Sequence, residues 1–358
     1  MPKIKVLICD DSAMVRKILQ TELSKDKNIE IIGAVPDPYV ARDKIIEEKP
    51  DVLLLDVEMP KMDGVTFLQR LMKHYPVRVI IVSSLAEAGS EVAMKAVEYG
   101  ALEVMCKPGS MYSVGDMSEQ LIYKIKAVAA VPDYKLKMIA DNAAANIAKA
   151  AAQVQAKAGQ PAVRAMIKTT NKIIAMGAST GGTEALREVL TAMPANIPPI
   201  VIVQHMPQHF TKTFADRLDS LCTIKVKEAN DMEILAPGKA LIAPGNKHMQ
   251  VVRSGAVYYA KLFDGPLVHH QRPAVENLFL SVAEYVGKNS VGVIMTGMGK
   301  DGAAGMLEMK KGGAHTIAQD EKSCVVFGMP KEAIDAGAVN QVVSLRDIPN
   351  AIIKAVSQ

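Results

Sequence analysis

The chain has 358 residues, of which 49% are hydrophobic and 22% charged, and its formal net charge is +4. This length suits two domains of ordinary size, each with its own core. No apolar run reaches the ~20 residues of a membrane span, the N-terminus lacks the features of a signal peptide, and 4% aromatic residues with a mild positive charge give no sign of a nucleic-acid surface. We therefore expect a cytoplasmic monomer that neither inserts into a membrane nor binds nucleic acid.

The first 130 residues alternate short apolar runs with segments of helical spacing. Five runs are predicted strands: 5–9, 29–35, 51–56, 77–84 and 101–107. Near-continuous apolar runs are typical of strands that are covered on both faces of a parallel sheet. The pattern predicts a doubly wound (βα)5 domain of the flavodoxin-like type over residues 1–130.

Residues 131–168 interrupt this alternation with an Ala-rich stretch that also carries Lys and Gln. Because it has few large apolar side chains, it is interpreted as a linker with some helix propensity. A solvated tether is favoured over a helix that docks on a neighbouring domain.

A second α/β alternation occupies residues 169–358. The runs 172–179, 197–205 and 291–299 again indicate parallel strands, so a second doubly wound, Rossmann-like domain is predicted. Residues 239–262 are interpreted as an antiparallel hairpin inserted in this domain, with its turn near Arg253–Gly255.

Polar residues stand at the ends of four strands predicted in the first domain: Asp10 and Asp11, Asp56, Ser83, and Lys107. Functional loops of open parallel sheets gather at the carboxyl ends of the strands. Three carboxylates there would repel one another unless a divalent cation neutralised them, and oxygen ligands suit Mg²⁺. Each Asp alone could be a turn or N-cap residue, but the whole set predicts a carboxylate that accepts a phosphoryl group.

The motifs at these positions resemble those of the response-regulator receiver family, with DD after strand one, D-x-x-M-P-x-M-D-G after strand three, S-S after strand four and K-P after strand five. The resemblance implies that Asp56 is phosphorylated by a histidine kinase and that Asp10, Asp11, Asp56 and the Glu58 carbonyl surround Mg²⁺. It also implies that Ser83 and Lys107 bind the phosphoryl oxygens. Receivers commonly carry an aromatic residue three positions before the Lys, where this chain has Val104.

A Gly-rich turn, G-A-S-T-G-G, surrounds Ser179 between a predicted strand and a predicted helix. Such a turn can cradle the phosphate of a dinucleotide, form a nucleophile elbow, or place Ser179 as a simple N-cap. The motif alone does not separate these three possibilities.

Two further residues at strand ends favour a nucleophilic serine. His205 is the last residue of the run 197–205 and Asp301 follows the run 291–299, so base, orienting acid and Ser179 could meet at one sheet edge. His209 is the nearest rival base, on a loop or helix start. The remaining histidines of this region are expected on the surface: His248, His269 and His270. Backbone N–H groups near Thr180 and Met298 are candidates for an oxyanion site.

The second half resembles the catalytic domain of chemotaxis protein-glutamate methylesterases, through the segments GASTGGTEAL, QHMPQHFTKTFADRL, APGNKHM, GVIMTGMGKDGAAGML and AQDEKSCVVFGMPKEAI. The resemblance implies a serine hydrolase that demethylates glutamate methyl esters of chemoreceptors, releases methanol, and deamidates receptor glutamines. It makes Ser179 the nucleophile, His205 the base and Asp301 its partner, with Thr180 and Met298 at the oxyanion and no cofactor in the hydrolase site. Relatives commonly read P-S-V-D where this chain has Pro273–Glu276, a change expected at the rim of the cleft.

The resemblance also implies that the unphosphorylated receiver limits access to the hydrolase and that phosphorylation relieves this. Two alternative functions fit the sequence less well. A transcriptional regulator would need a helix-turn-helix, whereas the second half predicts a β/α domain with Gly-rich turns. A nucleotide-binding or oxidoreductase output domain would need an acidic ribose ligand about 20 residues after the Gly-rich turn, and none stands at 195–203.

Overall fold

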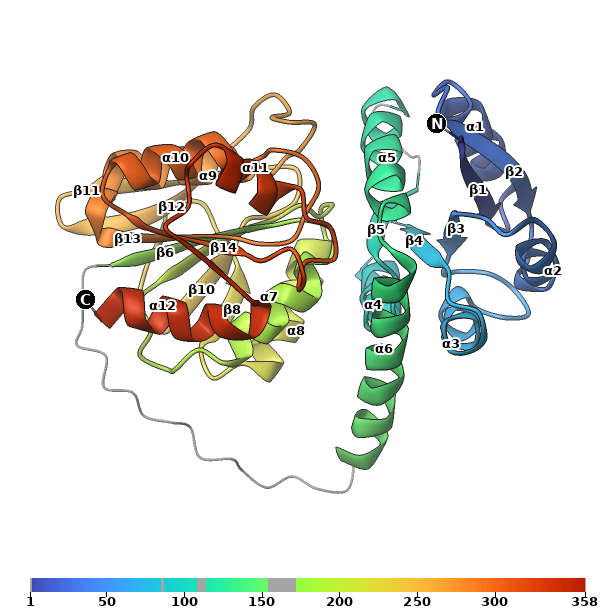
Figure 1. Ribbon diagram of the computed structural model, residues 1–358, viewed down its shortest axis with the longest axis horizontal. Helices are drawn as coiled ribbons and strands as arrows, with labels where there is room; N and C mark the ends of the chain where they lie inside the picture. Colours follow the sequence, from blue (N-terminus) through green and yellow to red (C-terminus); the bar gives the residue numbers. More distant parts are fainter. Residues whose placement is uncertain (1, 85–86, 108–113, 154–171, 358) are drawn as a thin grey trace. The chain divides into compact units, whose positions relative to one another are not determined.

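The computed structural model describes residues 2–84, 87–107, 114–153 and 172–357 (Figure 1). The chain divides into two compact units, Met1–Gly159 and Gln160–Gln358.

The first unit is a parallel five-stranded sheet in the order β2-β1-β3-β4-β5. Its strands are β1 (Ile4–Cys9), β2 (Ile29–Val35), β3 (Val52–Asp56), β4 (Arg78–Ser83) and β5 (Glu103–Cys106). Its helices are α1 (Ala13–Leu23), α2 (Pro38–Glu48), α3 (Gly64–His74), α4 (Glu87–Glu98), α5 (Val114–Ala129) and α6 (Asp133–Gln153). The predicted (βα)5 sheet is confirmed, and each predicted strand agrees with the observed one to within two residues.

Local sequence signals explain where these helices start. The Asp37 side chain accepts hydrogen bonds from the first turn of α2, and Pro38 occupies the first helical position. Asp63 likewise accepts the Thr66 N–H at the start of α3. Capped helices of this kind begin directly after the strand-end loops, so they hold those loops against the sheet.

Helix α6 differs from the solvated tether that the composition favoured. Leu136, Ala140 and Ala143 are buried, and α6 contacts α3 within the first unit. The tether prediction is therefore wrong for this helix. It failed because the buried face consists largely of alanine, whose small side chain packs closely but gives little apolar signal. The rest of the predicted linker, 154–168, lies outside the described residues.

The second unit is built on a seven-stranded parallel sheet in the order β15-β14-β13-β6-β7-β10-β8. The strands are β6 (Ile173–Ala178), β7 (Ile200–Gln204), β8 (Lys225–Glu228), β10 (Lys239–Ile242), β13 (Ser290–Ile294), β14 (His315–Gln319) and β15 (Gln341–Val343). The central strand β6 has β7 on one side and β13 on the other. The chain thus reverses its direction of travel across the sheet beside β6, which is where ligands bind in folds of this class.

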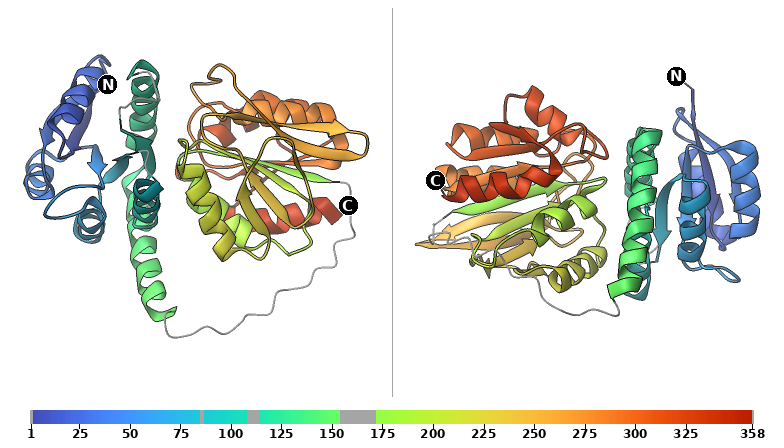
Figure 2. Two further views of the ribbon diagram at one scale, coloured as in Figure 1. Left: turned by 180° about the vertical axis from the view of Figure 1, so that it is seen from behind. Right: turned by 60° about the horizontal axis from the view of Figure 1, so that its bottom comes forward.

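Helices cover both faces of this sheet (Figures 1 and 2). On one face lie α9 (Val275–Tyr285), α10 (Ala303–Lys311) and α11 (Met329–Asp335), and on the other lie α7 (Gly182–Thr191), α8 (Phe210–Leu221) and α12 (Ile348–Ser357). Short 3₁₀ helices occur at Gly287–Asn289 and Leu345–Asp347. Within the described ranges, no helix combines the length and apolar character that crossing a membrane requires.

A small antiparallel sheet is inserted in the second unit, in the order β11-β12-β9, from β9 (Glu233–Ile234), β11 (His248–Ser254) and β12 (Val257–Phe263). The hairpin turns between Ser254 and Val257, close to the predicted place. The predicted hairpin was too long, however, because residues 239–242 form β10 of the main parallel sheet, where β10 pairs with β7 and β8.

Candidate functional site

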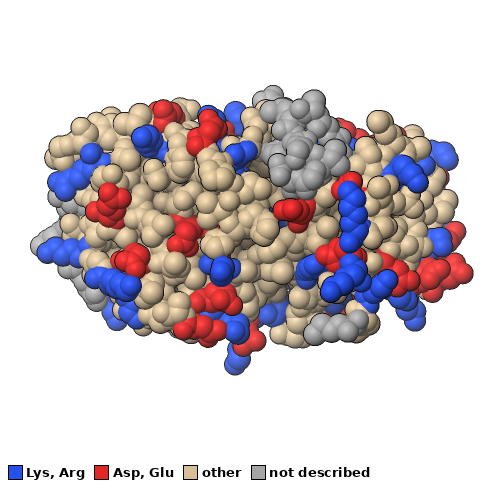
Figure 3. Space-filling view, turned by 90° about the horizontal axis from the view of Figure 1, so that it is seen from above, with Lys and Arg blue, Asp and Glu red and all other residues tan. Residues whose placement is uncertain are grey.

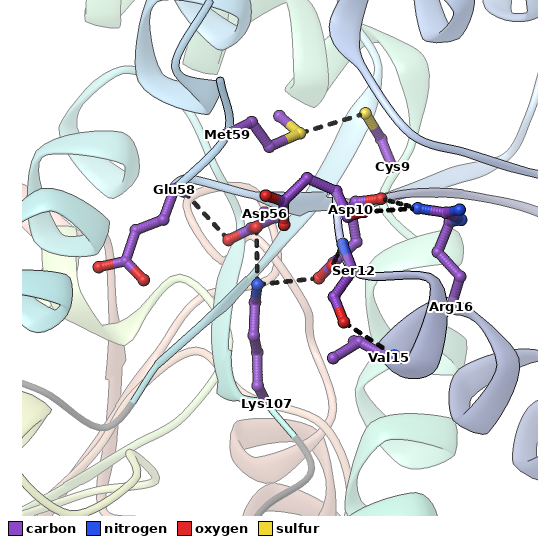
Figure 4. Close-up of polar contacts among 10 residues, drawn as sticks. Cys9, Asp10, Ser12, Val15, Arg16, Asp56, Glu58, Met59 and Lys107 are labelled. Atoms are coloured by element: carbon purple, nitrogen blue, oxygen red, sulfur yellow. Dashed lines mark hydrogen bonds and ion pairs between the residues drawn. The ribbon is translucent and has the colours of Figure 1, made fainter.

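The acidic residues of the first unit meet at the carboxyl edge of its sheet (Figure 4). Asp10 and Asp56 are each only 1% exposed, whereas Asp11 is exposed. One carboxylate oxygen from each of the three lies within 4.8 Å of the others. The Ser12 N–H donates to Asp10 Oδ1 at 2.8 Å and the Glu58 N–H donates to Asp56 Oδ1 at 3.0 Å. The structure therefore brings together the three predicted carboxylates.

Lys107 closes this pocket from the end of β5. Its ammonium donates to Asp56 Oδ2 at 2.6 Å and forms an ion pair with Asp10 Oδ2 at 3.1 Å. Its backbone N–H donates to the Ser83 carbonyl at 2.8 Å, which places the buried Ser83 beside it. Val104, three residues before Lys107 on β5, is buried. The position at which receivers commonly carry an aromatic residue is therefore part of the core here.

Burial governs the charge state of Asp56. Removal from water raises the pKa of the Asp56 carboxyl to about 6, although the Lys107 hydrogen bond and the Glu58 N–H work to lower it. Burial works to lower the pKa of Lys107, but its bonds to Asp56 and Asp10 outweigh burial and raise it. Two buried carboxylates thus share a single ammonium, which leaves the pocket with excess negative charge.

The donor set of this pocket fits a hard divalent cation. Asp10 Oδ2 is buried and has no hydrogen bond among the described residues, and it forms an ion pair with Lys107. Carboxylate and carbonyl oxygens are the ligands that Mg²⁺ takes in proteins. The carboxylates of Asp10, Asp11 and Asp56 are therefore suited to hold it.

In the second unit, the register of three strands brings Ser179, His205 and the loop of Asp301 together. Ala178 pairs with Gln204 across β6 and β7, so the next residues, Ser179 and His205, are neighbours at the sheet edge. The His205 N–H donates to the Ala178 carbonyl at 3.1 Å, which extends this pairing past the strand end. On the other side of β6, the Ser179 N–H donates to the Thr296 carbonyl at 2.9 Å, just after β13.

His205 and Asp301 are in direct contact. His205 Nε2 lies 2.7 Å from Asp301 Oδ2, and both side chains are almost fully buried. An ionised carboxylate only accepts hydrogen bonds, so Nε2 carries the proton and the neutral imidazole has its lone pair on Nδ1. Nδ1 is buried without a hydrogen-bond partner in the described part of the chain. It is the nitrogen available to accept a proton.

Asp301 is itself fixed by the start of α9. The Val275 N–H donates to Oδ2 at 2.7 Å and the Glu276 N–H donates to Oδ1 at 2.9 Å. The carboxylate thus satisfies two N–H groups of the first helical turn, where the helix dipole also favours a negative charge. Gly177 allows this approach, since a Cβ there would lie 2.3 Å from Val275 Cγ1.

Glycines shape the turn that presents Ser179. Gly181 has φ of +79°, and an added Cβ would lie 2.5 Å from Val325 Cγ2. At Gly182 a Cβ would lie 2.1 Å from the side-chain oxygen of Gln204. The turn therefore needs glycine for conformation at the first position and for space at the second.

The two candidate oxyanion residues differ in exposure. Thr180 is 2% exposed at the strand-to-helix turn, and Met298 is half-buried in the loop after β13. Gly328 and Met329 both donate backbone N–H groups to the Gly297 carbonyl, at 3.0 and 2.8 Å, which fixes the peptide that precedes Met298.

The other histidines have mixed outcomes. His209 directly precedes α8, in agreement with its predicted place on a loop or helix start, and its φ is +72°. His248 was expected on the surface, which is wrong: it is 1% exposed, with Nε2 2.9 Å from the Pro266 carbonyl. His269 is half-buried and His270 exposed in the loop after β12.

Three functional candidates were missed or misjudged from the sequence. Glu276 was expected at the cleft rim but is only 8% exposed, and it accepts the Gly302 N–H at 3.0 Å. Burial and the Asp301 charge raise the pKa of the Glu276 carboxyl. For Gln204 and Thr296, the sequence holds one indication of a functional role. Both stand at strand ends, Gln204 beside His205 and Thr296 beside the Gly-rich loop.

The sequence matches known protein families in both units. A sequence model of the CheB methylesterase family matches residues 174–352, and one of the response regulator receiver domain matches residues 6–116. A protein of Syntrophus aciditrophicus named protein-glutamate methylesterase/protein-glutamine glutaminase 2 is 55% identical over 99% of this chain and 100% of its own length. A Bdellovibrio bacteriovorus protein named protein-glutamate methylesterase/protein-glutamine glutaminase is 49% identical over 98% of this chain and 97% of its own.

One solved structure resembles the second unit. The crystal structure of the Thermotoga maritima CheB methylesterase catalytic domain matches with a TM-score of 0.51 and 41% sequence identity, covering 52% of this chain and 99% of that one. The Syntrophus and Bdellovibrio relatives, by contrast, match this chain over both units.

Proposed function

This chain belongs to the CheB methylesterase family, and from this premise we propose that it is a phosphorylation-regulated serine hydrolase of glutamate methyl esters on chemoreceptors. Residues 1–130 are the receiver and 169–358 the hydrolase, and within the intervening segment 131–168 helix α6 packs on the receiver. The observation that carries the hydrolytic part is the His205–Asp301 contact of 2.7 Å beside Ser179, with Nδ1 of the same imidazole buried and unpartnered among the described residues.

The reaction begins when Ser179 Oγ attacks the ester carbonyl carbon while His205 Nδ1 takes the hydroxyl proton. The carbonyl oxygen becomes an oxyanion, which we place near Thr180 and Met298. Asp301 stabilises the imidazolium through Nε2–H. Collapse breaks the carbon–oxygen bond of the methyl ester, the proton on Nδ1 passes to the departing methoxide, and methanol leaves.

The acyl-enzyme is then hydrolysed by the same groups. His205 Nδ1 takes a proton from water as the water oxygen attacks the acyl carbon, and it returns that proton to Ser179 Oγ as the ester to the enzyme breaks. The product is a free glutamate side chain. A glutamine side chain can follow the same route with ammonia as the leaving group, and we propose that this deamidation occurs, in keeping with the names of the relatives.

In the receiver, we propose that Asp56 accepts a phosphoryl group from a histidine kinase of the chemotaxis pathway. The carboxylate attacks phosphorus and the phosphorus–nitrogen bond of the phosphohistidine breaks, leaving an acyl phosphate. Lys107 and Ser83 donate to the phosphoryl oxygens. Mg²⁺ held by Asp10, Asp11, Asp56 and the Glu58 carbonyl supplies charge neutralisation when bound.

The partners follow from this chemistry: the kinase as phosphodonor and methylated cytoplasmic helices of chemoreceptors as substrate. We place the protein in the cytoplasm as a monomer. On the face drawn in Figure 3, basic and acidic side chains are interspersed, which favours no nucleic-acid partner. A nucleotide-binding or oxidoreductase output domain gains no support from the family matches.

The hydrolase assignment is tested with Ser179→Ala. The variant should release neither methanol from methylated receptor membranes nor ammonia from unmodified receptors, while Asp56 is still phosphorylated. Ser281→Ala is the matched control, because it removes another buried hydroxyl of the same unit, one bonded to the Val251 N–H. Retained methanol release in Ser179→Ala would refute the serine mechanism.

A further inference from the structure

The peptide group between Ser179 and Thr180 is held by its carbonyl oxygen. Gly182 N–H donates to the Ser179 carbonyl at 2.6 Å, and Gln204 Nε2 donates to the same oxygen at 3.0 Å. In a planar trans peptide the N–H points away from the carbonyl oxygen. Two donors on the Ser179 oxygen therefore fix the direction of the Thr180 N–H, the group proposed to meet the oxyanion.

The orientation of the Gln204 amide is well determined by its surroundings. Nε2 faces two carbonyl oxygens, those of Ser179 at 3.0 Å and His205 at 3.4 Å, so the nitrogen must point there. The amide is 2% exposed, and its Oε1 is buried with no hydrogen bond in the described ranges. A buried acceptor without a donor is unfavourable for stability. The side chain is thus better explained by what its nitrogen holds than by folding alone.

The next peptide is held by Thr296. Thr296 Oγ1 donates to the Thr180 carbonyl at 2.8 Å, and the hydroxyl accepts the Val325 and Val326 N–H groups at 3.1 and 3.0 Å. The Thr296 carbonyl also accepts the Ser179 N–H at 2.9 Å. One residue therefore contacts the backbone on both sides of the nucleophile.

We propose that Gln204 and Thr296 are positioning residues that together aim the Thr180 N–H at the oxyanion. Gln204 fixes the carbonyl before this N–H, and Thr296 fixes the carbonyl after it. Neither needs to touch the substrate. The inference rests on the proposed hydrolase function and adds to it the residues that pre-organise one oxyanion donor.

The chain offers a matched pair of buried threonines for the test. Thr296 is 1% exposed, and Thr316 is fully buried on β14, where its hydroxyl donates to Asn340 Oδ1 at 2.8 Å and accepts the Asn340 N–H at 3.0 Å. Valine at either position keeps the shape and removes the hydroxyl. Among the described residues, Thr316 makes no hydrogen bond to the nucleophile turn, so Thr316→Val reports the effect of losing a buried hydroxyl alone.

The variants Thr296→Val, Thr316→Val, Thr296→Ser and Gln204→Met are compared for kcat and KM of methanol release and for the rate at which phenylmethanesulfonyl fluoride sulfonylates Ser179. Losing an oxyanion donor lowers kcat about 10²–10³-fold, and a displaced donor should cost part of that. We expect Thr296→Val and Gln204→Met to lower kcat and the sulfonylation rate by about 10-fold or more, with KM within about 2-fold. Thr316→Val should stay within about 2-fold in both rates, and Thr296→Ser should restore most of the loss.

Equal rates in Thr296→Val and Thr316→Val, or wild-type rates in Gln204→Met, would overturn the inference. Should Thr296→Val fail to fold, Gln204→Met and Thr296→Ser still decide it. The sulfonylation rate needs no receptor, so it separates the two proposals. Absence of methanol release from the wild type would count against the methylesterase function, whereas the sulfonylation rates would still test the positioning residues.

Discussion

Replacing Asp301 with Asn tests the geometry of the hydrolase site, because Asn keeps the shape of the side chain and removes its negative charge. Asp301 Oδ2 accepts from both His205 Nε2 and the Val275 N–H, while Oδ1 accepts from the Glu276 N–H. If the new NH₂ group faces His205, the imidazole is protonated on Nδ1 and cannot act as base. If it faces Glu276 instead, the imidazole keeps its tautomer but loses the charge that stabilises the imidazolium.

Either orientation should lower kcat by roughly 10³–10⁴, by analogy with the removal of the acid from a serine–histidine–aspartate triad. Either one also leaves at least one buried N–H of α9 without an acceptor, which destabilises the fold by about 1–3 kcal/mol. In a unit of this size each kcal/mol lowers Tm by about 2–4 °C. Methanol release and thermal unfolding of the second unit measure the two effects separately.

Asp219→Asn is the matched control. Asp219 also accepts a backbone N–H through Oδ1, that of Val226 at 2.8 Å, but no hydrogen bond in the described part of the chain joins it to the triad. The control should keep kcat within about 2-fold. A kcat for Asp301→Asn within 10-fold of wild type, with Tm lowered as expected, would refute the role of Asp301 as the orienting acid.

Three further predictions concern both units. In EDTA, Asp56→Asn should stabilise the first unit at pH 7 by about 1–3 kcal/mol and have no such effect near pH 4, by urea unfolding. Burial raises the pKa of Asp56 to about 6, so the folded protein favours the protonated carboxyl. The contribution of this carboxyl to stability is complete below pH ~4 and is lost as the pH rises through 6. Equal free energies of unfolding for the wild type and Asp56→Asn at pH 7 would contradict this. Gly181→Ala should lower Tm and kcat more than Gly337→Ala. The two glycines have similar positive φ, but only a Cβ at Gly181 would lie against Val325. Thermal unfolding by circular dichroism and methanol release compare the two variants, and equal losses would show that backbone conformation alone matters. Deleting residues 1–165 should raise basal methanol release, and an unchanged or lower rate would argue against autoinhibition by the receiver.

Much of the fold was predictable because buried parallel strands are continuous apolar runs in the sequence. The five strands of the first unit and the two strands that end just before Ser179 and His205 are of this kind. The sequence misled where two strands are close in sequence but belong to different sheets. β10 and β11 are separated by only five residues, so they looked like one hairpin, although every residue from Ala240 to Ala243 is buried as a central parallel strand requires.

The site was predictable only in part, for a related reason. Residues that touch the reacting atoms have distinctive chemistry, and strand ends show where they gather, so Asp56, Ser179, His205 and Asp301 could be named. Residues that act on the backbone of the site carry no such mark. Thr296 and Gln204 reveal themselves through hydrogen bonds to carbonyl oxygens, which depend on the register of neighbouring strands.

The central claim is that a phosphoryl-accepting domain at Asp56 controls a serine hydrolase at Ser179. The most direct measurement is methanol release from methylated receptor membranes by the full-length chain, with and without a small-molecule phosphodonor and Mg²⁺. The phosphodonor should raise the rate for the wild type, leave Asp56→Asn at its basal rate, and have no effect on an inactive Ser179→Ala. A phosphodonor response that persists in Asp56→Asn, or methanol release by Ser179→Ala, would contradict it.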